Sequence, residues 1–440
     1  AEEVVTLVNA CFAKLSECVY RYEGTIDKYI GDEIMAIFGA PRAHEDDPER
    51  AIRTALAMCE ALEEFNAKLR LPVKPFQLTR RRALIDRLVF DPQVVAEARN
   101  HQQEQDLSRQ VVLDEVESYA REIVPAFNAY LYFRFGYWLA RGLSRSLYRV
   151  RLGSSDAEAV EAIPEEATVV FVMNHRSNMD YILVSHLAAE DSALSYAVGE
   201  WARIWPLEQL IRAMGAYFVR RRSRNDLYRR VLARYVQMAT AQGVTQAVFP
   251  EGDLSRDGRL RAPKLGLLDY MVRSFDPGVD HDILFLPVAI NYDRVLEDRT
   301  LLADLDPDVD ARKGLAAFGT AVGFLLKQLG LMARQKWHRF GYACVSVGAP
   351  ISTRVYLEQR NLDLGSLDRE TRFEWVGELA ETLMGAIARL IPVLPVSLVS
   401  TVLIQDPGRR YSDLELKTEV QSLAEDLEQA GALVYVPRHD

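Results

Sequence analysis

The sequence contains few cysteines, and their scarcity excludes several classes of protein. Four occur in 440 residues: Cys11, Cys18, Cys59 and Cys344. They form no C-x-x-C pair, and their spacings match no cysteine-ligated metal site. A disulfide framework is typical of short secreted chains that are dense in cysteine. We therefore expect four free, buried thiols in a reducing compartment, and no metal site.

Long apolar runs are also missing, because no stretch reaches the roughly 18 residues that a membrane-spanning helix needs. Segment 315–333 comes near this length but contains Lys327. Segment 127–143 mixes aromatic residues with arginines, which suits a membrane interface and equally suits an amphipathic core helix. The first residues have neither a basic start nor a cleavable apolar core, so we expect no signal peptide.

Excess positive charge is lacking as well, since the formal net charge is −10. This charge argues against general nucleic-acid binding. Hydrophobic residues make up 49% of the chain and charged residues 26%, as in ordinary globular proteins with a core. The length of 440 residues favours two or three domains.

Residue patterns divide the chain into four predicted regions. Residues 1–70 have the pattern of helix, hairpin, helix, with Gly31 and Asp32 at the turn. Two prolines then mark a boundary. Residues 78–150 are predicted to be mainly helical, and residues 406–440 to form a helical appendix. In residues 151–405, short β-rich runs alternate with helical segments, which predicts an α/β domain with a largely buried sheet.

Polar clusters follow four predicted strands of that domain. NHRSNMD follows ATVVFVM, RRRSRND follows GAYFV, EGDLSRDGRL follows QAVFP, and NYDR follows DILFLPVAI. Ligands of open α/β sheets bind beyond the carboxyl ends of the strands. We therefore expect the four clusters to converge on one cleft.

The first cluster places His175 and Asp180 five positions apart. A neutral imidazole can accept a proton from a hydroxyl group while a carboxylate on its other nitrogen fixes the tautomer. This spacing therefore predicts a general base for an acceptor that brings its own hydroxyl. The alternative is a surface turn in which Asn or Asp caps a helix.

The second and third clusters predict an anion site. Arg220 and Arg221 follow an apolar strand, where a solvated charged face is not expected, and guanidinium groups bind phosphate in bidentate fashion. Glu251 lies on a tight turn after a strand, where it can orient the substrate or the arginines, and Arg256 can donate to a phosphate. The alternatives are an ordinary solvated helix for the arginines and a helix cap or ion pair for Glu251.

These four clusters resemble, in order and spacing, the four conserved blocks of the glycerolipid acyltransferases. The stretches HRSNMDY, FVRR and INYDRV resemble most closely the bacterial-type glycerol-3-phosphate acyltransferases, and the likeness extends over about residues 78–440. The resemblance implies an α/β fold in which helices flank the sheet, and a helical region before it. It also implies peripheral attachment to the cytoplasmic face of the cell membrane.

The resemblance further implies the reaction. A fatty acyl group would pass from acyl-CoA or acyl-carrier protein to the 1-hydroxyl of glycerol 3-phosphate, without a cofactor. It implies that His175 is the base and Asp180 its partner. The phosphate would be bound by Arg220, Arg221, Arg256 and Lys264. The acceptor site would be shaped by Glu251, Gly252 and Ser255, and the acyl side would be lined by Pro287.

One departure from the family pattern concerns the third block. Close relatives tend to read E-G-G-R-S-R there, whereas Asp253 and Leu254 occupy the two middle positions of this sequence. The missing arginine leaves open a second acceptor, lysophosphatidate or another lysolipid. A third alternative is a signalling protein whose acyltransferase fold only binds lipid.

Residues 24–58 resemble the middle of a class III nucleotide cyclase, a partial α+β (ferredoxin-like) segment. The likeness implies a metal-binding role for the position of Asp32 and base recognition for that of Lys28. The strand with the second metal aspartate and the later catalytic strands of that family are absent from this sequence. Because two-metal chemistry needs both carboxylates, we expect no cyclase activity.

Overall fold

The computed structural model describes most of the chain. The residues described are 2–30, 33–40, 42–69, 81–128, 132, 136–188, 194–199, 207–220, 223, 225–298, 339–360, 362, 364 and 367–435. Segment 315–333, Arg221 and the turn residues Gly31 and Asp32 lie outside these ranges.

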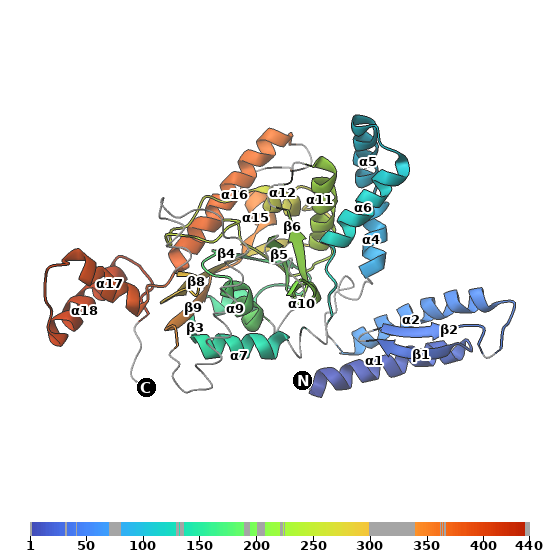
Figure 1. Ribbon diagram of the computed structural model, residues 1–440, viewed down its shortest axis with the longest axis horizontal. Coiled ribbons are helices and arrows are strands. Elements are labelled where there is room, and N and C mark those ends of the chain that lie inside the picture. Colours follow the sequence, from blue (N-terminus) through green and yellow to red (C-terminus); the bar gives the residue numbers. More distant parts are fainter. Residues whose placement is uncertain are drawn as a thin grey trace.

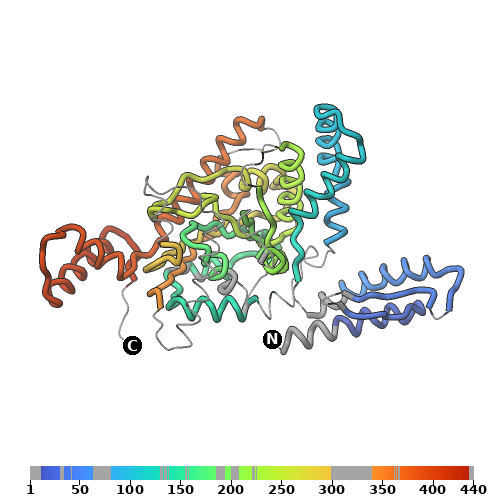
Figure 2. Tube along the Cα trace, viewed as in Figure 1, coloured from blue at the N-terminus to red at the C-terminus, as the bar shows by residue number. Residues whose placement is uncertain are grey.

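The amino-terminal unit has the predicted order of helix, hairpin and helix. Its elements are α1 (Glu2–Arg21), β1 (Thr25–Ile30), β2 (Glu33–Ile37) and α2 (Asp47–Leu69), and the two strands pair antiparallel. This unit lies apart from the large sheet (Figures 1 and 2). All four cysteines of the chain are free, as predicted, but Cys59 on α2 is exposed rather than buried.

Between the amino-terminal unit and the main sheet, the described residues form four helices, in agreement with the predicted helical region. They are α4 (Arg81–Val89), α5 (Pro92–Gln105), α6 (Arg109–Ile123) and α7 (Tyr137–Leu147). Asp91 caps α5 by accepting hydrogen bonds from the backbone N–H groups of Gln93 and Val94, and Pro92 stands at the first helical position. Buried apolar residues of α4, α5 and α6 belong to the same core cluster as one face of the sheet.

The sheet has the strand order β3-β9-β8-β4-β7-β5-β6, with β10 paired to β8. The strands are β3 (Arg149–Ser155), β4 (Thr168–Met173), β5 (Ser195–Gly199), β6 (Ala216–Val219), β7 (Gln246–Val248), β8 (Ile283–Tyr292), β9 (Tyr342–Val347) and β10 (Ile351–Ser352). Strands β4 to β8 are parallel, whereas β9 and β10 run antiparallel to β8. The sheet is therefore mixed but mostly parallel, and the predicted α/β class is confirmed.

Helices cover both faces of this sheet (Figure 1). The remaining helices are α8 (Ala157–Glu161), α9 (Met179–Ala188), α10 (Leu207–Ala213), α11 (Asp226–Ala241), α12 (Gly266–Val272), α15 (Thr353–Arg360), α16 (Arg369–Leu390), α17 (Pro395–Gln405) and α18 (Asp413–Gln429). Successive side chains of a strand point to opposite faces. Accordingly, Val172 packs in a core with α11, α12 and α16, while Met173 packs in a second core with α7 and α9.

The four strands predicted to precede the polar clusters are β4, β6, β7 and β8. Because they are parallel, their carboxyl ends lie at one edge of the sheet, as predicted. The sheet order places β8, β4 and β7 side by side but separates β6 from β7 by β5. With neighbouring strands about 4.8 Å apart, the end of β6 lies roughly 14 Å from that of β4. The first, third and fourth clusters therefore meet closely, and the second stands further along the edge.

Among the described residues, no helix is long and apolar enough to cross a membrane. The predicted membrane-interface segment 127–143 is described only in part, and its last portion forms α7. The predicted appendix after residue 405 contains α18, which lies against α17 on the far side of the sheet from the amino-terminal unit (Figure 1).

Candidate active site

His175 and Asp180 form a buried pair at the carboxyl end of β4. Their exposed fractions are 2% and 0%. His175 Nδ1 lies 2.9 Å from Asp180 Oδ2, so Nδ1 carries the proton that the carboxylate accepts. Nε2 has no hydrogen bond to any residue that the structure describes. A lone pair on Nε2 is thus left to accept a proton, as the predicted role requires.

The loop between β4 and α9 holds the Asp180 carboxylate in place by hydrogen bonds. The backbone N–H groups of Arg176 and Ser177 donate to Asp180 Oδ2 over 2.7 and 3.0 Å. Asp180 also stands in the first turn of α9, where the helix dipole favours negative charge. The five-residue spacing in the sequence is what lets the loop turn back onto its own carboxylate.

Tyr292, at the end of β8, supplies the remaining contact of the Asp180 carboxylate. Its hydroxyl donates to Asp180 Oδ1 over 2.6 Å. Burial and the negative charge of Asp180 raise the pKa of Tyr292 well above its ordinary value, so it stays a donor near neutral pH. The predicted fourth cluster began at Asn291, but β8 continues through Asn291 and Tyr292. No sequence signal pointed to Tyr292 beyond its place at a strand end.

Two further residues that the sequence reasoning missed anchor the same loop. The side chain of Asn174 exchanges two hydrogen bonds with the backbone of Ile290, at 2.7 and 2.9 Å, and so ties the end of β4 to β8. Glu297 accepts from the hydroxyl of Ser177 over 2.8 Å and from the backbone N–H of Asn178 over 3.1 Å. Burial raises the pKa of Glu297.

Glu251 joins the first cluster to the third. One of its carboxylate oxygens accepts from the backbone N–H of His175 over 2.8 Å, and the other accepts from that of Arg261 over 2.9 Å. Its exposed fraction is 1%, and this burial raises its pKa although the two N–H groups oppose the shift. Glu251 therefore positions the backbone that carries the base.

The rest of the third cluster forms a tight loop over the first. Ser255 is buried, its backbone N–H donates to the carbonyl of His175 over 2.9 Å, and its hydroxyl donates to the carbonyl of Arg259 over 2.7 Å. Gly252 has φ +73°, a conformation that favours glycine, and a Cβ there would lie 2.7 Å from the side chain of Lys264. The loop thus contacts the backbone of His175 directly.

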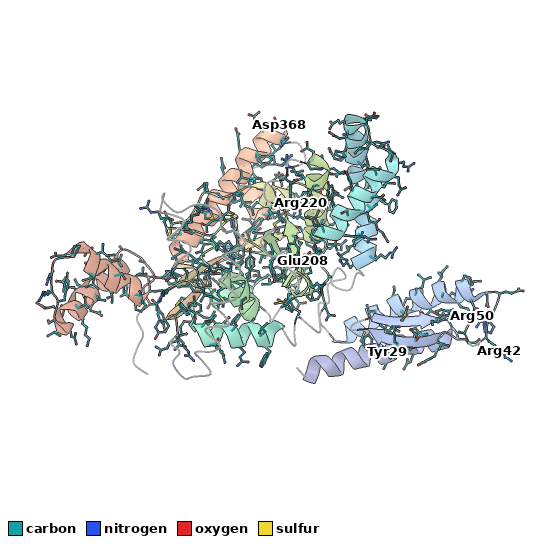
Figure 3. All side chains as sticks on the ribbon, in the orientation of Figure 1. Tyr29, Arg42, Arg50, Glu208, Arg220 and Asp368 are labelled. Carbon is teal, nitrogen blue, oxygen red and sulfur yellow. The ribbon has the colours of Figure 1, made fainter. Side chains whose placement is uncertain are left out.

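The predicted phosphate-binding residues differ in their surroundings. Arg220, which is labelled in Figure 3, donates to both carboxylate oxygens of Glu122 on α6, over 2.8 and 2.6 Å. Lys264 Nζ lies 2.8 Å from Asp253 Oδ2, so these two exposed side chains form an ion pair. Arg256 is exposed and has no ion pair within the described part of the chain.

Aromatic rings enclose the base. The ring of Phe249 lies 4.3 Å from that of His175, centroid to centroid, and the edge of Tyr181 lies 5.4 Å away. Pro287, predicted to line the acyl side, is buried within β8 opposite Val172. Within the ranges described above, no group of three or more His, Cys, Asp or Glu side chains is suited to a metal ion.

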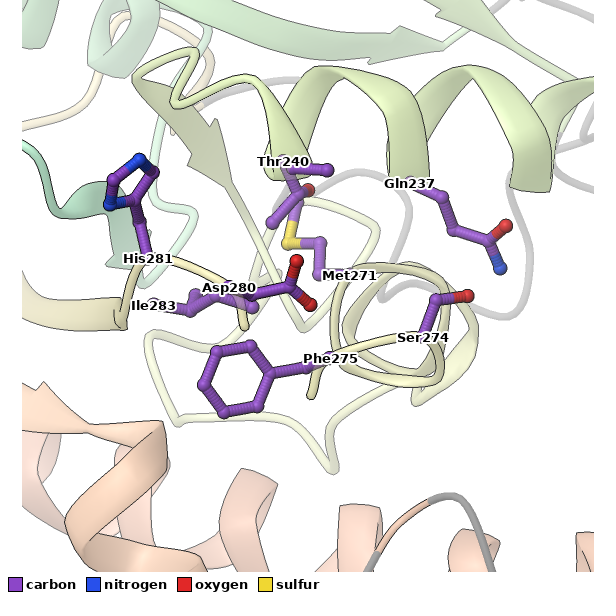
Figure 4. A pocket seen from close by; sticks show the side chains of 9 residues that line it. Gln237, Thr240, Met271, Ser274, Phe275, Asp280, His281 and Ile283 are labelled. Atoms are coloured by element: carbon purple, nitrogen blue, oxygen red, sulfur yellow. The ribbon is translucent and has the colours of Figure 1, made fainter. Parts of the chain in front are cut away.

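A small cavity at the opposite edge of the sheet does not belong to this site. It is lined by residues near the amino end of β8 and the carboxyl end of α11, among them Asp280, His281 and Thr240 (Figure 4). Its volume of about 20 Å³ has room for roughly one water molecule and none for a fatty acyl chain.

Comparisons with known proteins show which families this chain resembles. The family model described as Acyltransferase matches residues 155–291, and that described as Glycerol-3-phosphate acyltransferase C-terminal region matches residues 326–438. The chain is similar to the glycerol-3-phosphate acyltransferases. The resemblance of about residues 78–440 is confirmed, whereas neither model reaches residues 1–70, and nothing in these comparisons supports their likeness to a cyclase.

Three glycerol-3-phosphate acyltransferases show how far the similarity extends. Those of Aeromonas hydrophila, Pseudomonas syringae and Pseudomonas fluorescens are 28%, 30% and 27% identical, over 79%, 73% and 89% of this chain. The matches cover 43%, 38% and 45% of those proteins, so the chain spans less than half the length of these relatives. A solved lysophosphatidate (1-acyl-sn-glycerophosphate) acyltransferase from Thermotoga maritima is 18% identical, with TM-score 0.33, over 57% of this chain and 78% of its own.

Proposed function

We propose that this chain transfers a fatty acyl group from acyl-CoA or acyl-carrier protein to the 1-hydroxyl of glycerol 3-phosphate, forming lysophosphatidate for phospholipid synthesis. The observation that carries the proposal is the buried His175–Asp180 pair, whose Nε2 is left without a partner in the described structure. The relatives and the matched carboxyl-terminal region support glycerol 3-phosphate as the acceptor.

In the proposed mechanism, His175 Nε2 takes the proton of the acceptor hydroxyl as its oxygen attacks the thioester carbonyl carbon. The tetrahedral intermediate then collapses, the carbon–sulfur bond breaks, and the imidazolium returns the proton to the departing thiolate. Asp180 stabilises the imidazolium between these two steps. A thioester is already activated, so neither a covalent enzyme intermediate nor a metal ion is required.

Substrate entry requires movement near the base, because the exposed fraction of His175 is 2%. The rings of Phe249 and Tyr181 lie against the imidazole, so they are the side chains most directly placed to move. Exclusion of water after entry would strengthen the His175–Asp180 interaction and limit hydrolysis of the thioester.

We place the site at the cytoplasmic face of the cell membrane, with the chain attached peripherally. The acyl product is amphipathic and must leave for a bilayer, and no described helix can span one. Arg221 and Pro287 keep their proposed roles in phosphate and acyl binding. Arg220 already binds Glu122 through Nε and Nη2, so we assign it first to linking α6 with the end of β6.

For residues 1–70 we propose no catalytic role. The segment has the helix–hairpin–helix order of the partial cyclase unit, but it lies apart from the sheet that carries His175 (Figure 1). Formation of a cyclic nucleotide from ATP or GTP by the purified chain would contradict this. A signalling protein that only binds lipid is disfavoured, because binding alone gives no reason for the His175–Asp180 pair.

The test is an assay of the purified chain with labelled glycerol 3-phosphate and palmitoyl-CoA. Replacing His175 with Ala should lower kcat about 100- to 10,000-fold, the usual contribution of a general base. If the wild type makes no lysophosphatidate, or if His175→Ala makes as much as the wild type, the proposal fails. Lysophosphatidate offered as a parallel acceptor distinguishes the second candidate, a lysolipid acyltransferase.

A further inference from the structure

Two of the cations predicted to bind phosphate are already occupied. Arg220 is held in bidentate fashion by the buried carboxylate of Glu122. Lys264 pairs with Asp253, and both of these side chains are largely exposed. An anionic acceptor at either position would compete with a carboxylate for the cation. A phosphate should therefore find a stronger partner in a cation that has no carboxylate of its own.

Arg176, the residue after the proposed base, is such a cation. Its side chain is half-buried, yet its guanidinium forms no hydrogen bond or ion pair with any residue in the described ranges. Burial lowers the pKa of Arg176, and the more distant charges of Glu251, Asp180 and Asp257 offset this only in part. An arginine stays protonated in proteins, so a desolvated guanidinium without a direct partner is unfavourable until an anion binds.

The position of Arg176 is fixed from two sides. Its backbone N–H is bonded to Asp180, so the start of the side chain moves with the catalytic pair. Its Nη1 lies over Gly258, which has φ +79°, and a Cβ built on that glycine would be only 2.7 Å away. The loop that carries Gly258 is itself joined to His175 through Ser255. The guanidinium thus lies between the first and third clusters.

We propose that Arg176 is a further residue of this site that binds the phosphate of the acceptor, in addition to Arg221, and so helps to select a phosphorylated acceptor over an uncharged polyol. This inference rests on the proposed function. The acceptor hydroxyl must come within hydrogen-bond reach of His175 Nε2. Its phosphate is separated from that hydroxyl by a three-carbon backbone, so an anion-binding group is needed on the residues that adjoin the base.

The phosphates of CoA are a second source of the same chemistry. In the donor, the thioester is separated from the pyrophosphate by the long pantetheine arm, so those phosphates lie far from His175 when the carbonyl carbon is at the base. A cation that directly follows the base along the chain therefore fits the acceptor, and separate measurements for the two substrates distinguish them.

The experiment compares the wild type with Arg176→Gln, Arg176→Lys and Arg259→Gln. Arg259 is the matched control, because it lies on the same loop as Gly258 but its side chain is 88% exposed. Steady-state assays would give KM for glycerol 3-phosphate and palmitoyl-CoA, kcat/KM with glycerol as acceptor, and inhibition by inorganic phosphate. Circular dichroism and thermal unfolding would show that each variant is folded.

Arg176→Gln should raise KM for glycerol 3-phosphate about 10- to 100-fold, as expected for a lost charge-assisted hydrogen bond. KM for palmitoyl-CoA and kcat/KM with glycerol should change less than threefold, and inhibition by phosphate should weaken in parallel. Arg176→Lys should recover part of the affinity, because the charge remains without the bidentate geometry. Arg259→Gln should match the wild type.

Three results would overturn the inference while leaving the proposed function intact. These are an unchanged KM for glycerol 3-phosphate in folded Arg176→Gln, a rise in KM confined to palmitoyl-CoA, or an equal loss with glycerol and glycerol 3-phosphate. Absence of acyl transfer by the wild type would instead refute the proposed function itself.

Discussion

The hydroxyl group of Tyr292 should matter for catalysis although it does not touch the proposed substrate. Replacing Tyr292 with Phe removes one donor from Asp180 and keeps the ring, which packs 5.0 Å from Tyr148, centroid to centroid. Asp180 Oδ2 keeps its bonds to His175 and to two backbone N–H groups, whereas Oδ1 loses the 2.6 Å contact from Tyr292. The carboxylate of Asp180 can then rotate, because only one of its two oxygens still accepts hydrogen bonds from described residues.

The magnitude follows from the chemistry of this bond. A hydrogen bond to a charged acceptor contributes about 1.5–3 kcal/mol, and the loss is greatest where the group cannot reach water. Asp180 has an exposed fraction of 0%. We expect the free energy of unfolding to fall by about 1–3 kcal/mol. If about 1–2 kcal/mol of orientation is lost in the transition state, kcat falls about 5- to 30-fold.

The assay is kcat and kcat/KM for glycerol 3-phosphate from about pH 5 to 9. Without the hydrogen bond from Tyr292, the Asp180 carboxylate should interact more strongly with the protonated imidazole of His175. The acidic limb of the profile should therefore move to higher pH. The matched control is Tyr148→Phe. Tyr148 is equally buried in the same core cluster, but its hydroxyl donates to the carbonyl of Arg294 and not to Asp180.

Tyr148→Phe should lose stability without a shift in the pH profile. The reasoning fails if Tyr292→Phe keeps the wild-type kcat and profile while folded, because the contact with Asp180 would then have no role in the relay. It also fails if both variants shift the profile equally, since the effect would then come from general loosening of the core.

The remaining predictions concern Glu297 and the ion pair between Arg220 and Glu122. Burial raises the pKa of Glu297 above 4.5, so the folded chain binds this proton more tightly than the unfolded chain, and the stability it contributes is lost as pH rises through the folded value. Glu297→Gln should therefore flatten the decline in unfolding free energy just above about pH 4.5, as urea unfolding at a series of pH values would show. Arg220→Gln should lower the unfolding free energy by about 1–3 kcal/mol, which is less than for a fully buried ion pair because Arg220 is partly exposed. The double variant with Glu122→Gln should recover part of this loss, because no unpaired buried carboxylate remains. Full stability in the single variant, or no recovery in the double variant, would show that this pair is not a structural link.

Hydrophobic patterning predicted much of the fold because it reports on local structure. The runs that form β4, β6, β7 and β8 are short, apolar and followed by polar turns, so each was recognisable by itself. The strands β3, β5 and β9 were not predicted. They form because neighbouring strands supply hydrogen-bond partners and packing, and a sequence pattern contains neither.

By itself, the sequence determined the parts of the site that depend on short-range geometry. A turn after a strand brings Asp180 back onto His175 within five residues, so chain connectivity alone places the base beside its carboxylate. Only the tertiary structure decided which distant groups complete them. Tyr292 reaches Asp180 because β8 lies next to β4, and Glu122 occupies Arg220 because α6 packs near the end of β6. Whether Arg220 remains free for a phosphate depends on a contact between residues 98 positions apart, which forms only when the chain has folded.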